Sequence, residues 1–191
     1  MNDAEILLFI SKAVFNWLIQ ILYKTISLLE GHSFAWPPLP LPLAKLPEYG
    51  RYVQNLLVMA APSDVLDQYL RYCPNIINFW SDESLSQRQL ERLICLPLRH
   101  LKLGDSYCLS SVIPQNAFTS TTTSLFSTIT HLDIEELDIP FLSRFLSLTH
   151  LVLHEDVGPE VYGEVFRQHP RLKVLSICAG FAGEYPSRTW S

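Results

Sequence analysis

The sequence predicts an α/β fold built as a curved solenoid, with short parallel strands on the concave side and helices on the convex side. Three observations predict it. A six-residue pattern, apolar-x-x-apolar-x-apolar, recurs along the chain. The copies are spaced at intervals typical of structural repeats. The segments between the copies have the apolar periodicity of helices, so each repeat is expected to be a strand followed by a helix.

The six copies of the pattern predict six strands. Their intervals are 23, 22, 31, 19 and 24 residues, and most lie close to or within the period of leucine-rich repeats, roughly 20–29 residues. The spacing therefore predicts a leucine-rich-repeat-like solenoid. The middle apolar residues of the copies are Leu56, Phe79, Leu101, Leu132, Leu151 and Leu175.

Helices are expected between the strands, over residues 63–74, 84–97, 139–148 and 159–170. Ser63 is a candidate N-cap for the first of them, and Pro170 ends the last. Strand–helix–strand units normally form right-handed crossovers within a parallel sheet. The 31-residue interval contains an insertion, Gly104–Phe126, whose polar segment Thr119–Ser124 is expected to be a surface loop.

The N-terminal region is expected to form an apolar helix over Ile6–Tyr23, long enough to span a membrane. A polar stripe along it predicts that it lies half-buried on a protein core, with membrane attachment as the alternative. The stripe consists of Lys12, Asn16, Gln20 and Lys24.

Four regions are expected in the chain. Residues 1–30 form the N-terminal helix, 31–48 a proline-rich linker, 49–180 the solenoid and 181–191 a C-terminal tail. Alternating prolines in Trp36–Pro47 predict a stiff, extended linker.

Composition and motifs limit the function. The net charge of −5 and the pI near 5.6 argue against a general nucleic-acid binder, which needs a basic face. The sequence contains no G-x-S-x-G, P-loop or H-E-x-x-H motif, so we expect no enzymatic activity and no cofactor. Scattered cysteines without a C-x-x-C pair predict free thiols in an intracellular protein, cytoplasmic or nuclear; they are Cys73, Cys95, Cys108 and Cys178.

Several segments resemble a known family. "SKAVFNWLIQILYKTISL" (Ser11–Leu28) resembles the closing segment of the F-box in fungal, mushroom-type F-box and leucine-rich-repeat-like proteins. "YGRYVQNLLV", "CPNIINFW", "LPLRHLKL" and the two "THL" copies resemble the body of those proteins in the same order. The first half of the F-box, with its "LPxE" start, does not precede Ser11. The resemblance thus implies substrate recognition within a ubiquitin ligase, and it supplies no residues for binding the ligase adaptor.

The concave face is the candidate binding surface. Side chains alternate along a strand, so the residues on either side of each middle apolar residue point outward. We expect these residues to bind a protein ligand, with Trp80 and Leu57 as anchors. The candidate surface comprises Asn55, Leu57, Asn78, Trp80, His100, Lys102, His131, Asp133 and His150.

Three of these residues, His100, His131 and His150, are expected to form a row across neighbouring strands. Imidazoles in a row are able to bind a transition metal or to respond to pH. A metal site, however, requires ligands that converge on one point, whereas a row on a curved sheet diverges. We therefore predict a contact surface without a metal ion.

Overall fold

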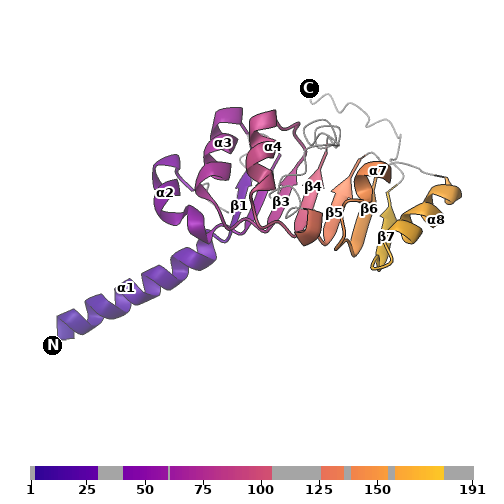
Figure 1. Ribbon diagram of the computed structural model, residues 1–191. Coiled ribbons are helices and arrows are strands. Elements are labelled where there is room, and N and C mark those ends of the chain that lie inside the picture. The colour runs from indigo at the N-terminus through magenta and orange to yellow at the C-terminus, as the bar shows by residue number, and fades with distance from the viewer. Residues whose placement is uncertain are drawn as a thin grey trace, which may run out of the picture.

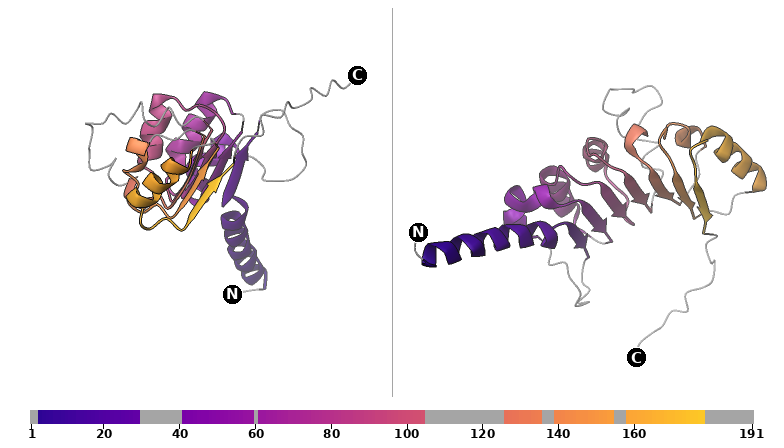
Figure 2. Two further views of the ribbon diagram at one scale, coloured as in Figure 1. Left: turned by 90° about the vertical axis from the view of Figure 1, so that its right-hand side faces the viewer. Right: turned by 90° about the horizontal axis from the view of Figure 1, so that it is seen from below.

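The computed structural model describes residues 3–29, 41–59, 61–104, 126–135, 139–154 and 158–178. The predicted α/β class is confirmed, because the described elements include a single sheet of seven parallel strands with helices packed against it (Figure 1). The end-on view in Figure 2 shows these helices on one side of the sheet. The opposite side, which we call the open face, is covered by no described element.

All seven strands are four residues long, and they are arranged in the sheet in the order in which they occur in the chain. Parallel neighbours need crossover connections, and helical segments supply these connections between several of the strands. The strands are β1 (Thr25–Leu28), β2 (Asn55–Val58), β3 (Asn78–Ser81), β4 (His100–Leu103), β5 (His131–Ile134), β6 (His150–Leu153) and β7 (Val174–Ile177).

The helical elements begin with the long helix α1, which precedes the sheet. Short helical turns follow β1, and single helices follow β2, β3, β5 and β6. The elements are α1 (Asp3–Leu22), η1 (Leu43–Lys45), α2 (Leu46–Tyr49), η2 (Gly50–Tyr52), α3 (Ser63–Tyr72), α4 (Gln87–Ile94), α7 (Ile139–Leu142) and α8 (Pro159–Gln168).

The core is a ladder of apolar side chains between the sheet and the helices. The predicted register is confirmed, because the middle apolar residues of the six predicted strands lie side by side. From β2 to β6 none of these residues is more than 2% exposed. Burial of a ladder of this kind is the main source of stability in such a sheet. The helices contribute Tyr69, Leu90, Leu93, Leu142 and Val165 to the same core.

The sheet contains one strand that the sequence analysis did not predict. β1 lies in the region assigned to the N-terminal helix, and it pairs in parallel with β2. Its residues Ile26 and Leu28 are buried at 0% and 6% exposure, so they extend the core by one strand.

The extended linker predicted over Trp36–Pro47 is wrong where the structure describes it. Residues 43–49 form helical turns, and Leu41 and Leu46 are buried at 1% and 0% exposure. The Tyr69 hydroxyl donates a hydrogen bond to the Leu41 carbonyl over 2.6 Å. The apolar residues between the prolines are drawn into the core, which outweighs the preference of proline for extended chain.

The prediction that the N-terminal helix is half-buried on the core is also wrong. α1 projects from the end of the sheet (Figure 1), and every residue from 11 to 18 is exposed. Of residues 11–22, Ile19 alone is buried, at 5% exposure. The helix axis runs off the sheet, so no other described element is available to cover the apolar side chains. No described helix has the length and apolar character needed to cross a membrane.

A smaller correction concerns helix capping. Pro62, not Ser63, is the N-cap of α3, and no side chain caps it. The Ser63 hydroxyl instead accepts a hydrogen bond from Gln89 of α4 over 3.0 Å. Gln89 also completes a capping box with Ser86 at the start of α4, so one glutamine fastens two neighbouring helices. The predicted loop Thr119–Ser124 and the tail 181–191 lie outside the described residues.

Candidate functional site

The open face contains a groove of about 500 Å³ that crosses the strands from β1 to β6. All nine residues of the predicted binding surface line it, from Asn55 on β2 to His150 on β6. They meet because alternate residues of each strand face the same side and the strands are in register. Trp80 is 40% exposed, as expected of an anchor, whereas the second predicted anchor, Leu57, is half-buried.

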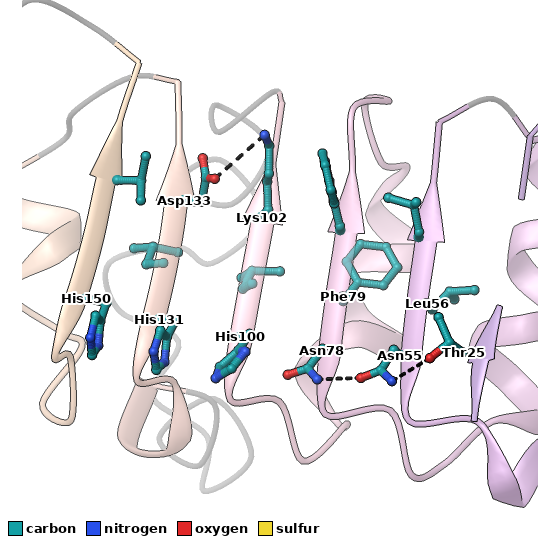
Figure 3. Close-up of a pocket in the computed structure, with 15 residues that line it drawn as sticks. Thr25, Asn55, Leu56, Asn78, Phe79, His100, Lys102, His131, Asp133 and His150 are labelled. Atoms are coloured by element: carbon teal, nitrogen blue, oxygen red, sulfur yellow. Dashed lines mark hydrogen bonds and ion pairs between the residues drawn. The ribbon is translucent and has the colours of Figure 1, made fainter. Parts of the chain in front are cut away.

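The first residues of the strands form a continuous row along the amino-end side of the groove (Figure 3). Its first part is a hydrogen-bonded chain of amides. The Asn78 Nδ2 donates to the Asn55 Oδ1 over 2.5 Å, and the Asn55 Nδ2 donates to the Thr25 Oγ1 over 2.8 Å. Each amide therefore orients the next, and Figure 3 shows the Asn78 side-chain oxygen directed toward His100.

The second part of the row is a stack of imidazole rings, which we call the histidine row: His100, His131 and His150. The ring centroids of His100 and His131 are 4.0 Å apart, with an interplanar angle of 50°. Those of His131 and His150 are 4.1 Å apart and nearly parallel, at 5°. Strand spacing near 4.8 Å forces identical side chains at the same register position into contact of this kind.

A threonine hydroxyl lies within hydrogen-bond distance of Nδ1 in two of these rings. The Thr149 hydroxyl donates to the Thr130 carbonyl over 3.0 Å, so its oxygen accepts from the His150 Nδ1, 2.8 Å away. Thr130 repeats the arrangement, donating to the Arg99 carbonyl over 3.3 Å and accepting from the His131 Nδ1 over 2.9 Å. A hydroxyl has a single proton, so in the arrangement in which it donates to the carbonyl both rings carry theirs on Nδ1. Their Nε2 atoms are left as acceptors, without a hydrogen bond to any described residue.

The environment of the row disfavours its protonation. Partial burial lowers the pKa of His100, and His150, two strands away, and Arg99 lower it further. Burial likewise lowers the pKa of His131, with added effects of the imidazoles on both sides. Both rings are therefore neutral over a wider pH range than free histidine.

A second row, at the third residue of each strand, carries charge. The Lys102 ammonium lies 4.4 Å from the centre of the Trp80 ring and 3.7 Å from Oδ2 of Asp133. The other oxygen of Asp133 is 2.8 Å from the Nε2 of His154, which follows β6. The Trp80 indole N–H donates to Asp82 over 2.9 Å. These contacts hold the exposed Trp80 in place from both sides, as a binding anchor requires.

The described residues contain no group of three His, Cys, Asp or Glu side chains placed to hold a metal ion. The geometry of the histidine row gives the reason, since near-parallel stacked rings direct their Nε2 lone pairs side by side and not toward a common point. Asp133 is the acidic residue nearest to the row in sequence, and its carboxylate oxygens already contact Lys102 and His154. The arrangement is suited to contacts with an extended ligand surface.

Six residues that line the groove are not on the predicted surface: the middle apolar residues Leu56, Phe79, Leu101 and Leu132, together with Thr25 on β1 and Val152 on β6. The signal for Thr25 was present, because Tyr23, Ile26 and Leu28 repeat the six-residue pattern of the other strands. The adjoining helical pattern obscured it. The alternation along the strands predicts that Val152 faces outward, but Val152 was not included in the candidate surface.

No known family model, curated protein or solved structure matches this chain.

Proposed function

We propose that this chain is a leucine-rich-repeat-like solenoid that acts as a non-enzymatic protein-interaction module and binds its ligand in the groove of the open face. One observation carries the proposal. The outward residues of five neighbouring strands, β2 to β6, line a single groove, and an exposed tryptophan held by Lys102 and Asp82 lies within it. Ordered aromatic residues in a groove are typical anchors of protein interfaces.

The test compares two matched aromatic substitutions. Trp80→Ala removes the proposed anchor, whereas Phe166→Ala removes a similarly exposed aromatic (48%) from α8, a helix on the covered side of the sheet. Partners recovered with the full chain and identified by mass spectrometry should be lost with the first variant and retained with the second. Loss with both variants or with neither would contradict the proposal.

The F-box resemblance supports a setting for this module, namely substrate recognition within a ubiquitin ligase. We propose that the groove supplies the substrate-binding part of that function. Purified ligase adaptor, mixed with the chain and analysed by size exclusion, tests the link directly. Co-elution would support it, and separate elution would leave a recognition module that works outside such a ligase.

The described cysteines support a reducing compartment, the cytoplasm or the nucleus. Cys73, Cys95 and Cys178 are all free thiols. Burial raises the pKa of Cys73 to about 12, so this thiol stays protonated and unreactive. Proteins of oxidising compartments more often pair their cysteines.

A second candidate function is attachment to a membrane surface through α1. Phe15, Trp17, Ile21 and Leu22 of this projecting helix are 53–61% exposed. Large apolar side chains on such a helix insert into the interface of a bilayer, parallel to its plane. Co-sedimentation with lipid vesicles tests this candidate: Trp17→Ser with Ile21→Ser should abolish it, and Phe166→Ser should not.

A further inference from the structure

We infer that the ligand of the open face is an acidic protein segment, bound along the amino ends of the strands by the histidine row and the cations beside it. This inference rests on the proposed function of the groove as a protein-binding surface, and it adds the chemistry of the partner. It is carried by the distribution of charge on the sheet and by the geometry of the three imidazoles.

Charge is separated between the two edges of the open face. The residue before each strand lies at the amino-end edge, because all strands are parallel. At three of these seven positions it is an exposed cation, Lys24, Arg99 or Lys173, and none of the three forms an ion pair with a described residue. The other four positions carry Gln54, Ile77, Thr130 and Thr149.

The opposite edge has the reverse sign. The residue that follows β3 is Asp82, and the residue that follows β5 is Glu135; both are exposed. An acidic ligand is therefore attracted to the amino-end edge and repelled from the carboxyl-end edge, which fixes where on the groove it binds. The histidine row lies on the attractive side, with Arg99 directly before its first member.

The histidine row is prepared to donate hydrogen bonds to such a ligand once it is protonated. In a protonated ring both nitrogens carry a proton; Nδ1 of His131 and of His150 then donates to the adjacent threonine hydroxyl, which leaves Nε2–H for the ligand. The resulting N–H groups, on rings about 4 Å apart, would meet a line of carboxylates. Charge-assisted hydrogen bonds of this type are about twice as strong as neutral ones.

Binding and protonation are coupled through the groups around the row. Among the described residues no acidic side chain offsets the charge of the histidine row, because β3 contributes Asn78 at this level, β7 contributes Val174, and Asp133 is paired with Lys102 and His154. Arg99 and the mutual contact of the rings disfavour protonation. A bound carboxylate reverses that balance, so the protein takes up protons on binding and the affinity rises as the pH falls.

The experiment measures binding of a fluorescein-labelled oligo-aspartate peptide to the full chain by anisotropy at constant ionic strength. Between about pH 7.5 and pH 5.5 the affinity should rise about tenfold, which corresponds to uptake of a single proton over part of this range. In the variant His100→Gln/His131→Gln/His150→Gln this rise should disappear while weak binding to the cations remains. The single variant His131→Gln provides the same test if the triple variant does not fold.

Two further variants locate the ligand on the edge. Arg99→Gln should weaken binding several-fold at every pH, because it removes an unpaired cation from the attractive edge. Glu135→Gln, the matched neutralisation on the opposite edge, should leave the affinity equal or slightly higher. A loss with Glu135→Gln and none with Arg99→Gln would overturn the assignment.

Other outcomes overturn the inference without affecting the proposed function. Affinity independent of pH, the same pH response in the histidine variants, or tighter binding of an oligo-lysine peptide or a single-stranded oligonucleotide would each exclude an acidic protein segment. The proposed function would still stand if partners depend on Trp80 and not on Phe166. Conversely, oligo-aspartate binding without any Trp80-dependent partner would retain the anion-binding row and reject the interaction module.

Discussion

The two parts of the amino-end row occupy equivalent positions on one sheet but are built in different ways. From β1 to β3 the polar side chains satisfy each other, since Asn78 donates to Asn55 and Asn55 donates to Thr25. From β4 to β6 the imidazoles contact each other, and the Nε2 atoms of His131 and His150 remain available. The difference shows that the same strand position can hold side chains that hydrogen-bond to each other in one half of the sheet and stacked imidazoles in the other.

The two parts also differ in how they respond to protons. Asparagine does not titrate, so the amide chain keeps its hydrogen bonds at any ordinary pH. An imidazole gains a charge when it is protonated, and partial burial, with a smaller effect of nearby imidazoles, lowers the pKa of His100 and His131. Four predictions sharpen this comparison or break it.

The largest effect is expected in the core beneath both parts, where they should behave alike. Leu56 of β2 and Leu132 of β5 are each 1% exposed. Leu56→Ala and Leu132→Ala should each lower the free energy of unfolding by about 2–5 kcal/mol, measured with urea. Unequal losses outside this range would mean that the two halves differ in packing as well as in their outward rows.

The next effect distinguishes the rows themselves. Asn55→Ala removes the bond to Thr25 and leaves the Asn78 amide without its acceptor, so it should cost about 1–3 kcal/mol. His150→Ala, at the end of the histidine row, loses one ring contact and should cost about 0.5–1 kcal/mol. If the histidine substitution costs as much as the asparagine one, the row is structural and its role in recognition is weakened.

The pH dependence of stability should arise in the histidine half. The folded-state pKa values of His100 and His131 lie below the ordinary histidine value, so near that value the unfolded chain binds more protons. The contribution of these two histidines to the free energy of unfolding is therefore complete above pH ~6.5. It is lost as the pH falls toward their folded-state pKa values. In urea titrations, the variant His100→Gln/His131→Gln should show a weaker dependence of stability on pH. The remaining dependence should come from buried His169, because burial also lowers the pKa of that imidazole.

Asn55→Ala serves as the control for the pH measurement. It lowers the stability at every pH by a constant amount and leaves the slope of the wild-type chain unchanged, because no titrating group is removed. A change of slope in this variant would show that the amide chain takes part in the titration of the neighbouring imidazoles.

The smallest effect concerns the position of one proton. Thr149→Val removes the hydroxyl that accepts from the His150 Nδ1, while preserving the shape of the side chain. Nitrogen chemical shifts of the ring should show a proton on Nδ1 in the wild-type chain and a mixture of tautomers in the variant. A wild-type ring protonated on Nε2 would mean that the row presents donors in its neutral state.

The sequence was sufficient to predict most of the sheet and most of the groove for the same physical reason. The apolar residues of a buried strand must alternate with outward ones, and parallel pairing then brings equal positions together. Six strands and nine groove residues follow from this rule. β1 was missed because its pattern directly follows that of a helix, and a short apolar segment is compatible with either structure.

Other features depend on long-range contacts that a linear pattern does not contain. Leu41 and Leu46 are buried because a helix from the next repeat lies over them, which proline content alone does not indicate. The exposure of α1 follows from its direction relative to the sheet. The histidine tautomers depend on whether the hydroxyls of Thr130 and Thr149 donate to the backbone carbonyls beside them. A linear sequence pattern does not contain these contacts.

The incomplete burial of the last strand, β7, has a consequence for how this protein unfolds. Among the described residues β7 pairs with β6 alone, and its Leu175 and Ile177 are half-buried where Leu151 and Leu153 of β6 are fully buried. When the order of strands in a sheet follows their order in the chain, each strand is stabilised only by its nearest neighbours. We therefore expect unfolding to begin at β7, the less buried of the two edge strands, and to proceed strand by strand toward β1. Amide exchange should be fastest at that end, so the molecule has a built-in direction of opening.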